Sequence, residues 1–135
     1  HEAKSKADFV LVIVHGGTEL YNLPTPRMKE AYRFFIDNGA DAVVNHHQHC
    51  YSGYEIYKNR PIVYGLGNFC MDKEPIRIGQ LWNYGYMVIW DTNLPSKIEL
   101  IPYEQCSSLP TVKLLPPDSF KDILDIAELK SRRGE

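Results

Sequence analysis

Three of the five histidines lie close together in the sequence and have the spacing of a metal site. His46, His47 and His49 follow the apolar residues 43–44 after a single Asn45. In an extended chain, residues two apart point the same way, so His47 and His49 can face one site while His46 turns aside. Neutral imidazole is the commonest protein metal ligand, and metal-bound water is a nucleophile at neutral pH. The cluster therefore indicates metal-assisted hydrolysis.

A fourth histidine follows a second apolar segment. His15 comes directly after residues 9–14 and precedes two glycines. If these two apolar segments are neighbouring parallel strands, His15, His47 and His49 lie at one edge of a sheet. Three imidazoles there could hold a divalent ion and leave a position for water, and Mn, Fe or Zn would fit such ligands. The alternative is that they are hydrogen-bonded loop side chains that bind no metal.

Two further polar residues could act at the same site. Glu19 follows His15 by four positions and could be a ligand, a general base, a contact to a cationic substrate group or a solvated loop carboxylate. Asn68 follows Gly65 and Gly67, which do not form a phosphate-binding GxGxxG and are typical of a tight turn. We expect Glu19 and Asn68 to position substrate or water.

The elements that carry these residues can be predicted from local patterns. Residues 9–14 are a continuous apolar run, which favours a strand buried on both faces. Thr25 and Pro26 are typical of a helix start, and Asn38-Gly39 of a helix end. A second strand begins at residues 41–44. The order strand, helix, strand predicts a βαβ unit with parallel strands.

The second half of the chain has the pattern of antiparallel strands. Residues 54–57 and 61–64 flank a short polar turn and predict a hairpin. Residues 84–90 alternate and are rich in aromatic side chains, and a turn then leads to residues 97–101. These two segments are expected to pair. The fold class is therefore α/β, with a βαβ unit followed by a mostly antiparallel meander.

The two ends of the chain give weaker signals. Residues 1–8 have the pattern of the last turns of a helix, and the proline-containing stretch 109–117 is expected to be irregular. Asp118 is a candidate cap for a final helix, which would carry its apolar residues on one side. Those residues are Phe120, Ile123, Leu124, Ala127 and Leu129.

The composition restricts the partners that the chain is expected to bind and the state of its cysteines. The 135 residues are enough for one domain with a real core, and the net charge of −2 gives no reason to expect nucleic acid or an anionic membrane. No apolar run is long enough to span a membrane. Cys50, Cys70 and Cys106 form no CxxC pair and are expected to be reduced thiols. Cys50 could be a soft metal ligand or a small buried hydrophobe.

Three segments share their order and spacing with one known family. Residues 15–21 read His-Gly-Gly-Thr-Glu-Leu-Tyr, and the family has His-Trp-Gly-x-Glu-Tyr. Residues 39–49 look like Gly-Ala-Asp-x-Val-Ile-Gly-x-His-Pro-His, and residues 64–69 like Tyr-Ser-Leu-Gly-Asn-Phe. Together the segments resemble the CapA family of poly-γ-glutamate capsule synthesis proteins. Any one of them alone would not be specific.

The resemblance implies a calcineurin-like metallophosphoesterase fold, which is a sandwich of two sheets flanked by helices. It also implies a two-metal centre. In that superfamily His15 and His47 would bind one metal and His49 the other, and His46 would fall on a variable position. The implied substrate is a phosphoester or an acidic polymer.

The sequence departs from the family in several places. Gly16 stands for the usual Trp, Asn45 for Gly and Gln48 for Pro, and none of these changes removes a candidate ligand. The superfamily's upstream Asp-x-His, Gly-Asp and Asn-His-Glu motifs are absent from these residues. We therefore expect residues 1–135 to form a single domain that is the C-terminal part of a larger CapA-like domain. Any targeting segment would lie upstream, so the compartment stays open.

Three functions compete on this basis. In the first, the parent protein is a metal-dependent hydrolase or transferase of capsule or poly-γ-glutamate metabolism that uses Mn, Fe or Zn, and the fragment alone is expected to be inactive or nearly so. In the second, it is a non-catalytic component of polymer synthesis or export that binds an acidic polymer. In the third, it is a stand-alone α/β domain without metal. An incomplete fold would expose a sheet edge, so we expect pairing with the missing N-terminal half or with a second copy.

Overall fold

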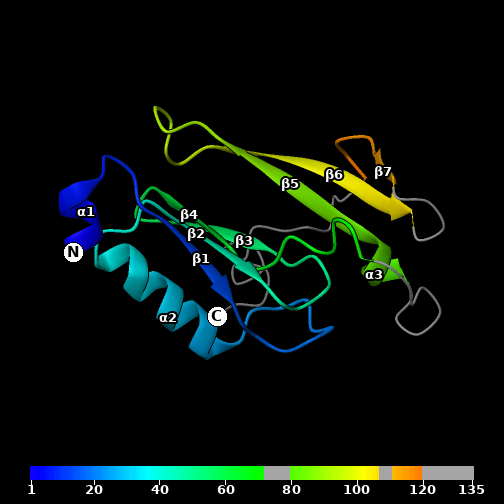
Figure 1. Cartoon of the computed structure of the whole chain (residues 1–135), viewed down its shortest axis with the longest axis horizontal. Helices are drawn as coiled ribbons and strands as arrows, with labels where there is room; N and C mark the ends of the chain where they lie inside the picture. Colours follow the sequence, from blue (N-terminus) through cyan, green and yellow to red (C-terminus); the bar gives the residue numbers. More distant parts are fainter. Residues whose placement is uncertain (72–79, 107–110, 120–135) are drawn as a thin grey trace, which may run out of the picture.

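The computed structural model describes residues 1–71, 80–106 and 111–119 of the chain. Within these residues the chain forms a four-stranded sheet and a three-stranded sheet (Figure 1). Helix α2 lies on one side of the first sheet, and the second sheet lies on the other side. The chain is therefore of mixed α/β class, as its sequence predicts.

The first sheet has the strand order β1-β2-β4-β3. Its strands are β1 (Leu11–His15), β2 (Ala42–His46), β3 (Tyr54–Tyr57) and β4 (Arg60–Val63). β1 pairs with β2 in parallel, and β4 pairs with β3 in an antiparallel hairpin. Both pairings confirm the sequence prediction. β2 also pairs in parallel with β4, which places β2 in the interior of the sheet.

Helix α2 (Pro26–Asp37) connects the two parallel strands and forms the core with them. Thr25 caps the helix, because its hydroxyl accepts a hydrogen bond from the backbone N–H of Met28 at 3.2 Å. Gly39 has a φ of 102°, the left-handed conformation that ends many helices. The buried residues of the helix pack on β2, β4 and Tyr64; they are Met28, Tyr32 and Ile36.

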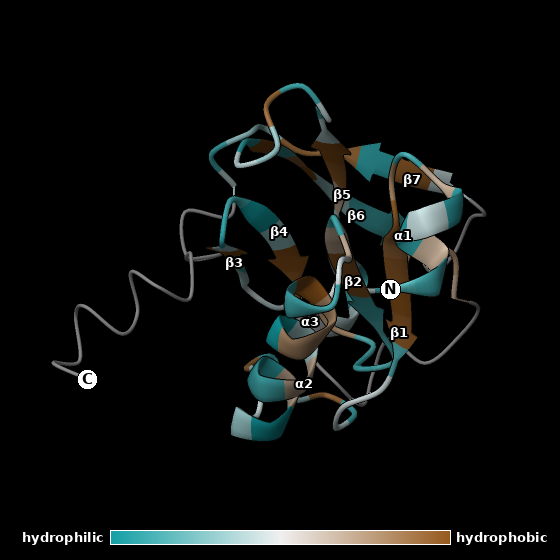
Figure 2. Cartoon of the chain, turned by 90° about the vertical axis from the view of Figure 1, so that its left-hand side faces the viewer, coloured by the Kyte–Doolittle hydropathy of each residue, from teal (hydrophilic) through white to brown (hydrophobic). Residues whose placement is uncertain are grey.

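Strand β1 departs from the prediction that both of its faces would be buried. Val12 and Val14 pack toward the core under α2, but Leu11 is 53% exposed and Ile13 is 67% exposed. Burial of each face of a strand depends on what packs against it, and a hydrophobic run does not reveal whether its second face is covered. β1 is one of the hydrophobic segments in Figure 2.

The second sheet is an antiparallel meander of β5 (Tyr84–Trp90), β6 (Ile98–Cys106) and β7 (Thr111–Leu114). The pairing of β5 with β6 confirms the prediction. The prediction of an irregular stretch over residues 109–117 is wrong for residues 111–114, because pairing with the end of β6 makes them a strand. The helix predicted after Asp118 lies outside the described residues.

Two isolated backbone pairs hold the loop after β4 near the candidate site. Tyr51 pairs with Leu66 between two loops of the first sheet, and Gly67 pairs with Gly85 at the start of β5, which joins the two sheets. Gly67 has a φ of 86°, and a Cβ atom there would collide with the backbone of Tyr84 and Gly85. A glycine is therefore required at this position for the loop after β4 to reach the second sheet.

The N-terminal helix α1 (Glu2–Lys6) is tied to the first sheet by charge. Asp41 is buried before β2 and forms ion pairs with Lys4 at 2.7 Å and Arg60 at 3.0 Å. Its carboxylate also accepts a hydrogen bond from the backbone N–H of Val10. In the described part of the chain, no helix is long and apolar enough to cross a membrane.

Candidate metal centre

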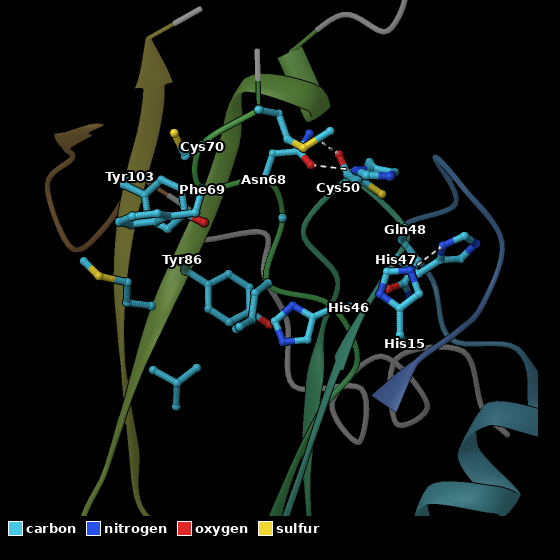
Figure 3. A pocket seen from close by; sticks show the side chains of 16 residues that line it. His15, His46, His47, Gln48, Cys50, Asn68, Phe69, Cys70, Tyr86 and Tyr103 are labelled. Carbon is cyan, nitrogen blue, oxygen red and sulfur yellow. Dashed lines mark hydrogen bonds between the residues drawn. The ribbon is translucent and has the colours of Figure 1, made fainter. Parts of the chain in front are cut away.

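A pocket of about 540 Å³ lies between the two sheets, at the C-terminal ends of β1 and β2 (Figure 3). Four of the five histidines line it, namely His15, His46, His47 and His49. Tyr86 and Tyr103 of the second sheet also line it. The volume is in the usual range for small-molecule sites, and the end of parallel strands is where such sites form.

His15 and His47 form the closest pair in the pocket. His15 is the last residue of β1, and its Nε2 lies 3.2 Å from Nδ1 of His47 (Figure 3). Two nitrogens that bind one ion at about 2.0–2.1 Å with tetrahedral geometry lie roughly 3.3 Å apart. The pair therefore has the spacing of two ligands of one ion. A direct N–H···N hydrogen bond has the same spacing.

The backbone that carries His47 and His49 is not an extended strand. β2 ends at His46, and His47 and His49 have φ values of 103° and 56°. The premise that strand alternation makes these two side chains parallel is therefore wrong, because a turn sets their directions. Their ring centroids lie 6.3 Å apart. Left-handed conformations of this kind in residues other than glycine are uncommon, and they concentrate at functional sites.

His49 is held by Asn68 from the loop after β4. Its Nδ1 lies 2.8 Å from Oδ1 of Asn68, and the Asn68 Nδ2 donates to the backbone carbonyl of His49 at 3.0 Å. The ring of Trp82, from the short helix α3 (Gln80–Asn83), lies 5.2 Å from the His49 ring. His49 is thus fixed along its edge and over its face.

His46 lines the same pocket, although strand alternation predicted that its side chain would point away from the site. The parallel register places His46 directly beside His15, so both side chains emerge on one face of the sheet. Burial lowers the pKa of His46, and the nearby His15 lowers it further. His46 is therefore a neutral imidazole at physiological pH. The position of His46 follows from the register in which β1 pairs with β2, and the sequence alone does not specify that register.

Glu19 and Cys50 differ in how the structure places them. Glu19 is exposed in the turn after β1 and does not belong to the described pocket lining. Cys50 lines the pocket but is buried, and burial raises the pKa of its thiol to about 11. A protonated thiol is a poor ligand, which favours the interpretation of Cys50 as a small buried hydrophobe.

The sequence model of a bacterial family matches residues 1–73, just over half of the chain; its description is "Bacterial capsule synthesis protein PGA_cap". The chain belongs to the PGA_cap family. The match includes every candidate site residue named from the sequence, and it ends before β5.

Two curated relatives of this PGA_cap chain are Bacillus proteins. One is the "Capsule biosynthesis protein CapA" of Bacillus anthracis, 41% identical over 70 residues, which are 52% of this chain and 17% of the relative. The other is the "PGA biosynthesis protein CapA" of Bacillus subtilis (strain 168), 43% identical over 72 residues, 53% of this chain and 19% of the relative. The matched part thus spans less than a fifth of each.

A shorter match extends the similarity to another genus. The "Uncharacterized protein y4sH" of Sinorhizobium fredii (strain NBRC 101917 / NGR234) is 60% identical over 40 residues, which are 30% of this chain and 9% of that protein.

The described residues of the PGA_cap chain do not assemble a full ligand set. Among them, no group of three or more His, Cys, Asp or Glu side chains is arranged to hold a metal ion. Neither a carboxylate nor a Lys or Arg side chain belongs to the described pocket lining. The site consists of a histidine pair, a separate His49 and neutral neighbours.

Asn45 and Gln48 support the site through buried hydrogen bonds. The sequence identified these two residues only as departures from the family pattern. Asn45 is buried, and the two hydrogens of its Nδ2 are shared among three acceptors within hydrogen-bond distance, the carbonyls of Gly16 and Tyr64 and Oε1 of Gln48. Its Oδ1 accepts from the hydroxyl of Tyr32 at 2.7 Å. Asn45 therefore ties the loop after His15 to the turn that carries His47.

The side chain of Gln48 is buried in the same turn. Within the described residues its Nε2 has no hydrogen-bond partner, while its Oε1 accepts from Asn45. Gln48 lines the pocket, but its Nε2 is buried, so this amide is a buried polar group without a described partner.

Proposed function

We propose that this chain supplies the histidine side of a divalent metal centre in a protein of bacterial capsule synthesis. The observation that carries the proposal is the 3.2 Å spacing of His15 Nε2 and His47 Nδ1 at the ends of two parallel strands. The family match and the printed names of the CapA relatives support the link to capsule synthesis. The two-sheet arrangement is compatible with one part of a metallophosphoesterase sandwich.

Each histidine has its own role in this proposal. His15 and His47 hold one ion, and His49 holds a second one; Mn, Fe or Zn suits these ligands. When bound, such an ion supplies an activated water for attack on a phosphoester or a related bond. Because the described pocket lining carries no Lys or Arg, the charge of an anionic substrate must be met by the ions.

The remaining ligands must come from outside the described pocket lining. We propose that carboxylates from another part of a larger CapA-like protein, or from a second copy, complete the centre. The exposed apolar face of β1 supports this, because Leu11 and Ile13 lie on the same strand as His15 and are available for packing against another protein surface. The substrate we propose is a phosphoester or an acidic polymer such as poly-γ-glutamate.

One observation favours a second candidate function. The described residues hold no group of three potential ligands, and a non-catalytic component that binds an acidic polymer would need no complete centre. Such a component would bind at most one ion, in a structural role.

Metal content and phosphodiesterase activity separate the two functions. We expect the longest natural protein that contains this chain to copurify with Mn, Fe or Zn and to hydrolyse a chromogenic phosphodiester. His47→Ala should lose both properties. His1→Ala is the matched control, because His1 is the histidine outside the pocket.

Bound metal without turnover would favour the binding component. Absence of metal from the wild-type protein after expression in metal-supplemented medium would contradict the proposed metal centre.

A further inference from the structure

The amide of Asn68 has one possible orientation in this structure. Its Nδ2 faces two backbone carbonyls, those of His49 at 3.0 Å and Trp82 at 3.1 Å. Carbonyl oxygens only accept hydrogen bonds, so the two hydrogens of Nδ2 are both required there. A flipped amide would place Oδ1 against two other oxygens. The Asn68 Oδ1 must therefore be the atom that lies 2.8 Å from His49 Nδ1.

This orientation determines which nitrogen of His49 carries the proton. Oδ1 of Asn68 has no hydrogen to donate, so Nδ1 of His49 must be the donor. In the neutral ring, Nε2 then keeps its lone pair and is the nitrogen left for the pocket. We propose that Asn68 is a positioning residue, which fixes His49 as its Nδ1–H tautomer and presents Nε2 to a bound divalent cation.

The second sheet holds Asn68 in this role. The carbonyl of Trp82 accepts a second hydrogen bond, at 3.0 Å, from Nε2 of Gln105 in β6. Oε1 of Gln105 in turn accepts from the backbone N–H of Met71 at 2.9 Å. Asn68 and Gln105 are each only 4% exposed. A buried network in which every amide group has a partner leaves little freedom for rotation.

The positioning of Asn68 involves several elements. The first sheet and its loops carry His15, His47 and His49. The carbonyl of Trp82 in α3 orients the Asn68 amide, and Gln105 of β6 holds that carbonyl. Partners of a ligating histidine commonly fix its tautomer and orientation in this way. The cation role of His49 Nε2 rests on the proposed function, whereas the tautomer itself follows from the hydrogen bonds alone.

The tautomer can be measured in the metal-free chain. Long-range ¹H–¹⁵N spectra of the ¹⁵N-labelled 135-residue chain, recorded with a chelator at about pH 8 where histidines are usually neutral, distinguish the two forms. We expect His49 to be the Nδ1–H tautomer. A wild-type His49 protonated at Nε2 would overturn the proposal, and this readout requires no variant.

Variants test whether Asn68 is the cause. Asn68→Leu removes the acceptor, so we expect a mixture of tautomers and a zinc affinity about 10–100-fold weaker by calorimetry. Asn68→Asp keeps an oxygen acceptor and should retain the Nδ1–H tautomer, although the chain loses two donors. Asn93→Ala is the control, because Asn93 lies in an exposed turn and its described partner is Asp91.

The outcomes separate this inference from the proposed function. If folded Asn68→Leu keeps the wild-type tautomer, the positioning role is wrong. If wild-type His49 is the Nδ1–H tautomer and the longest natural protein that contains this chain binds no zinc, the positioning role stands and the metal centre is wrong.

Discussion

At the scale of single residues, the site combines three imidazoles with a turn that most residues avoid. His47 and His49 both have positive φ values, and Asn45 anchors the turn from the core. Such conformations are destabilising by on the order of 1–3 kcal/mol, and persist where the surroundings enforce them. The turn brings His47 to His15, which an extended strand would not do.

Glycine at position 47 should therefore relieve strain. We expect His47→Gly to be more stable than His47→Ala by about 1 kcal/mol in urea unfolding, because glycine adopts a φ of 103° readily. Both variants lack the imidazole, so the difference between their stabilities reports the backbone conformation at position 47.

The same pair of substitutions at His46 is the control. His46 lies in β2, where glycine should be less stable than alanine. Equal stabilities of His47→Gly and His47→Ala would contradict a strained turn.

At the scale of elements, α2 is fastened to the first sheet by a buried carboxylate as well as by apolar packing. Glu55 of β3 accepts two hydrogen bonds from Arg33 of α2 and one from the hydroxyl of Tyr64. Burial alone would raise the pKa of Glu55, but the hydrogen bonds from Arg33 and Tyr64 outweigh it and lower the pKa. The pair thus positions the helix that covers β2.

This arrangement predicts a dependence of stability on acid. A carboxyl with a lowered folded pKa stabilises the fold fully above its unfolded pKa of about 4.3. That stability is lost as the pH falls below this value and through the folded pKa. At neutral pH we expect the free energy of unfolding of Glu55→Gln to be lower than that of the wild type by roughly 1–3 kcal/mol. Below about pH 4 the difference between the two proteins should be smaller, because the wild type has then lost the stability that the ionised carboxylate provides.

Glu99→Gln is the matched control, since Glu99 is exposed in β6. Urea unfolding as a function of pH provides the measurement. Parallel pH profiles for the wild type and Glu55→Gln would contradict the role of this carboxylate.

At the scale of the whole molecule, the first sheet has an uncovered edge strand. Leu11 and Ile13 of β1 are exposed on the side of the sheet away from α2. An exposed, apolar edge strand is a ready template for association. The described elements account for the pocket but leave this face open.

The isolated chain should therefore self-associate. We expect a concentration-dependent dimer or larger species in sedimentation experiments, and Ile13→Lys should shift it to the monomer. Ile89→Lys is the control, because Ile89 is a similarly exposed apolar residue on β5. A monodisperse monomer at all concentrations would contradict the prediction.

Local signals in the sequence predicted the elements well, whereas relations between elements were harder to predict. Thr25 and Gly39 mark the ends of α2 by their own chemistry, and the parallel strands follow from the βαβ order. The exposed face of β1 and the pairing of β7 depend on distant segments. For the site, the histidines were identifiable by type, but the turn at His47 and the partner network of Asn68 come from tertiary contacts.

The position of bound metal is the most direct test of the proposed histidine site. Crystals of the longest natural protein that contains this chain, soaked in Mn²⁺ and measured near the manganese absorption edge, would show the ion by anomalous scattering. We expect a peak within about 2.3 Å of both His15 Nε2 and His47 Nδ1, and a separate one at Nε2 of His49. This expectation would be contradicted by an empty map in which the two nitrogens of His15 and His47 remain in direct contact.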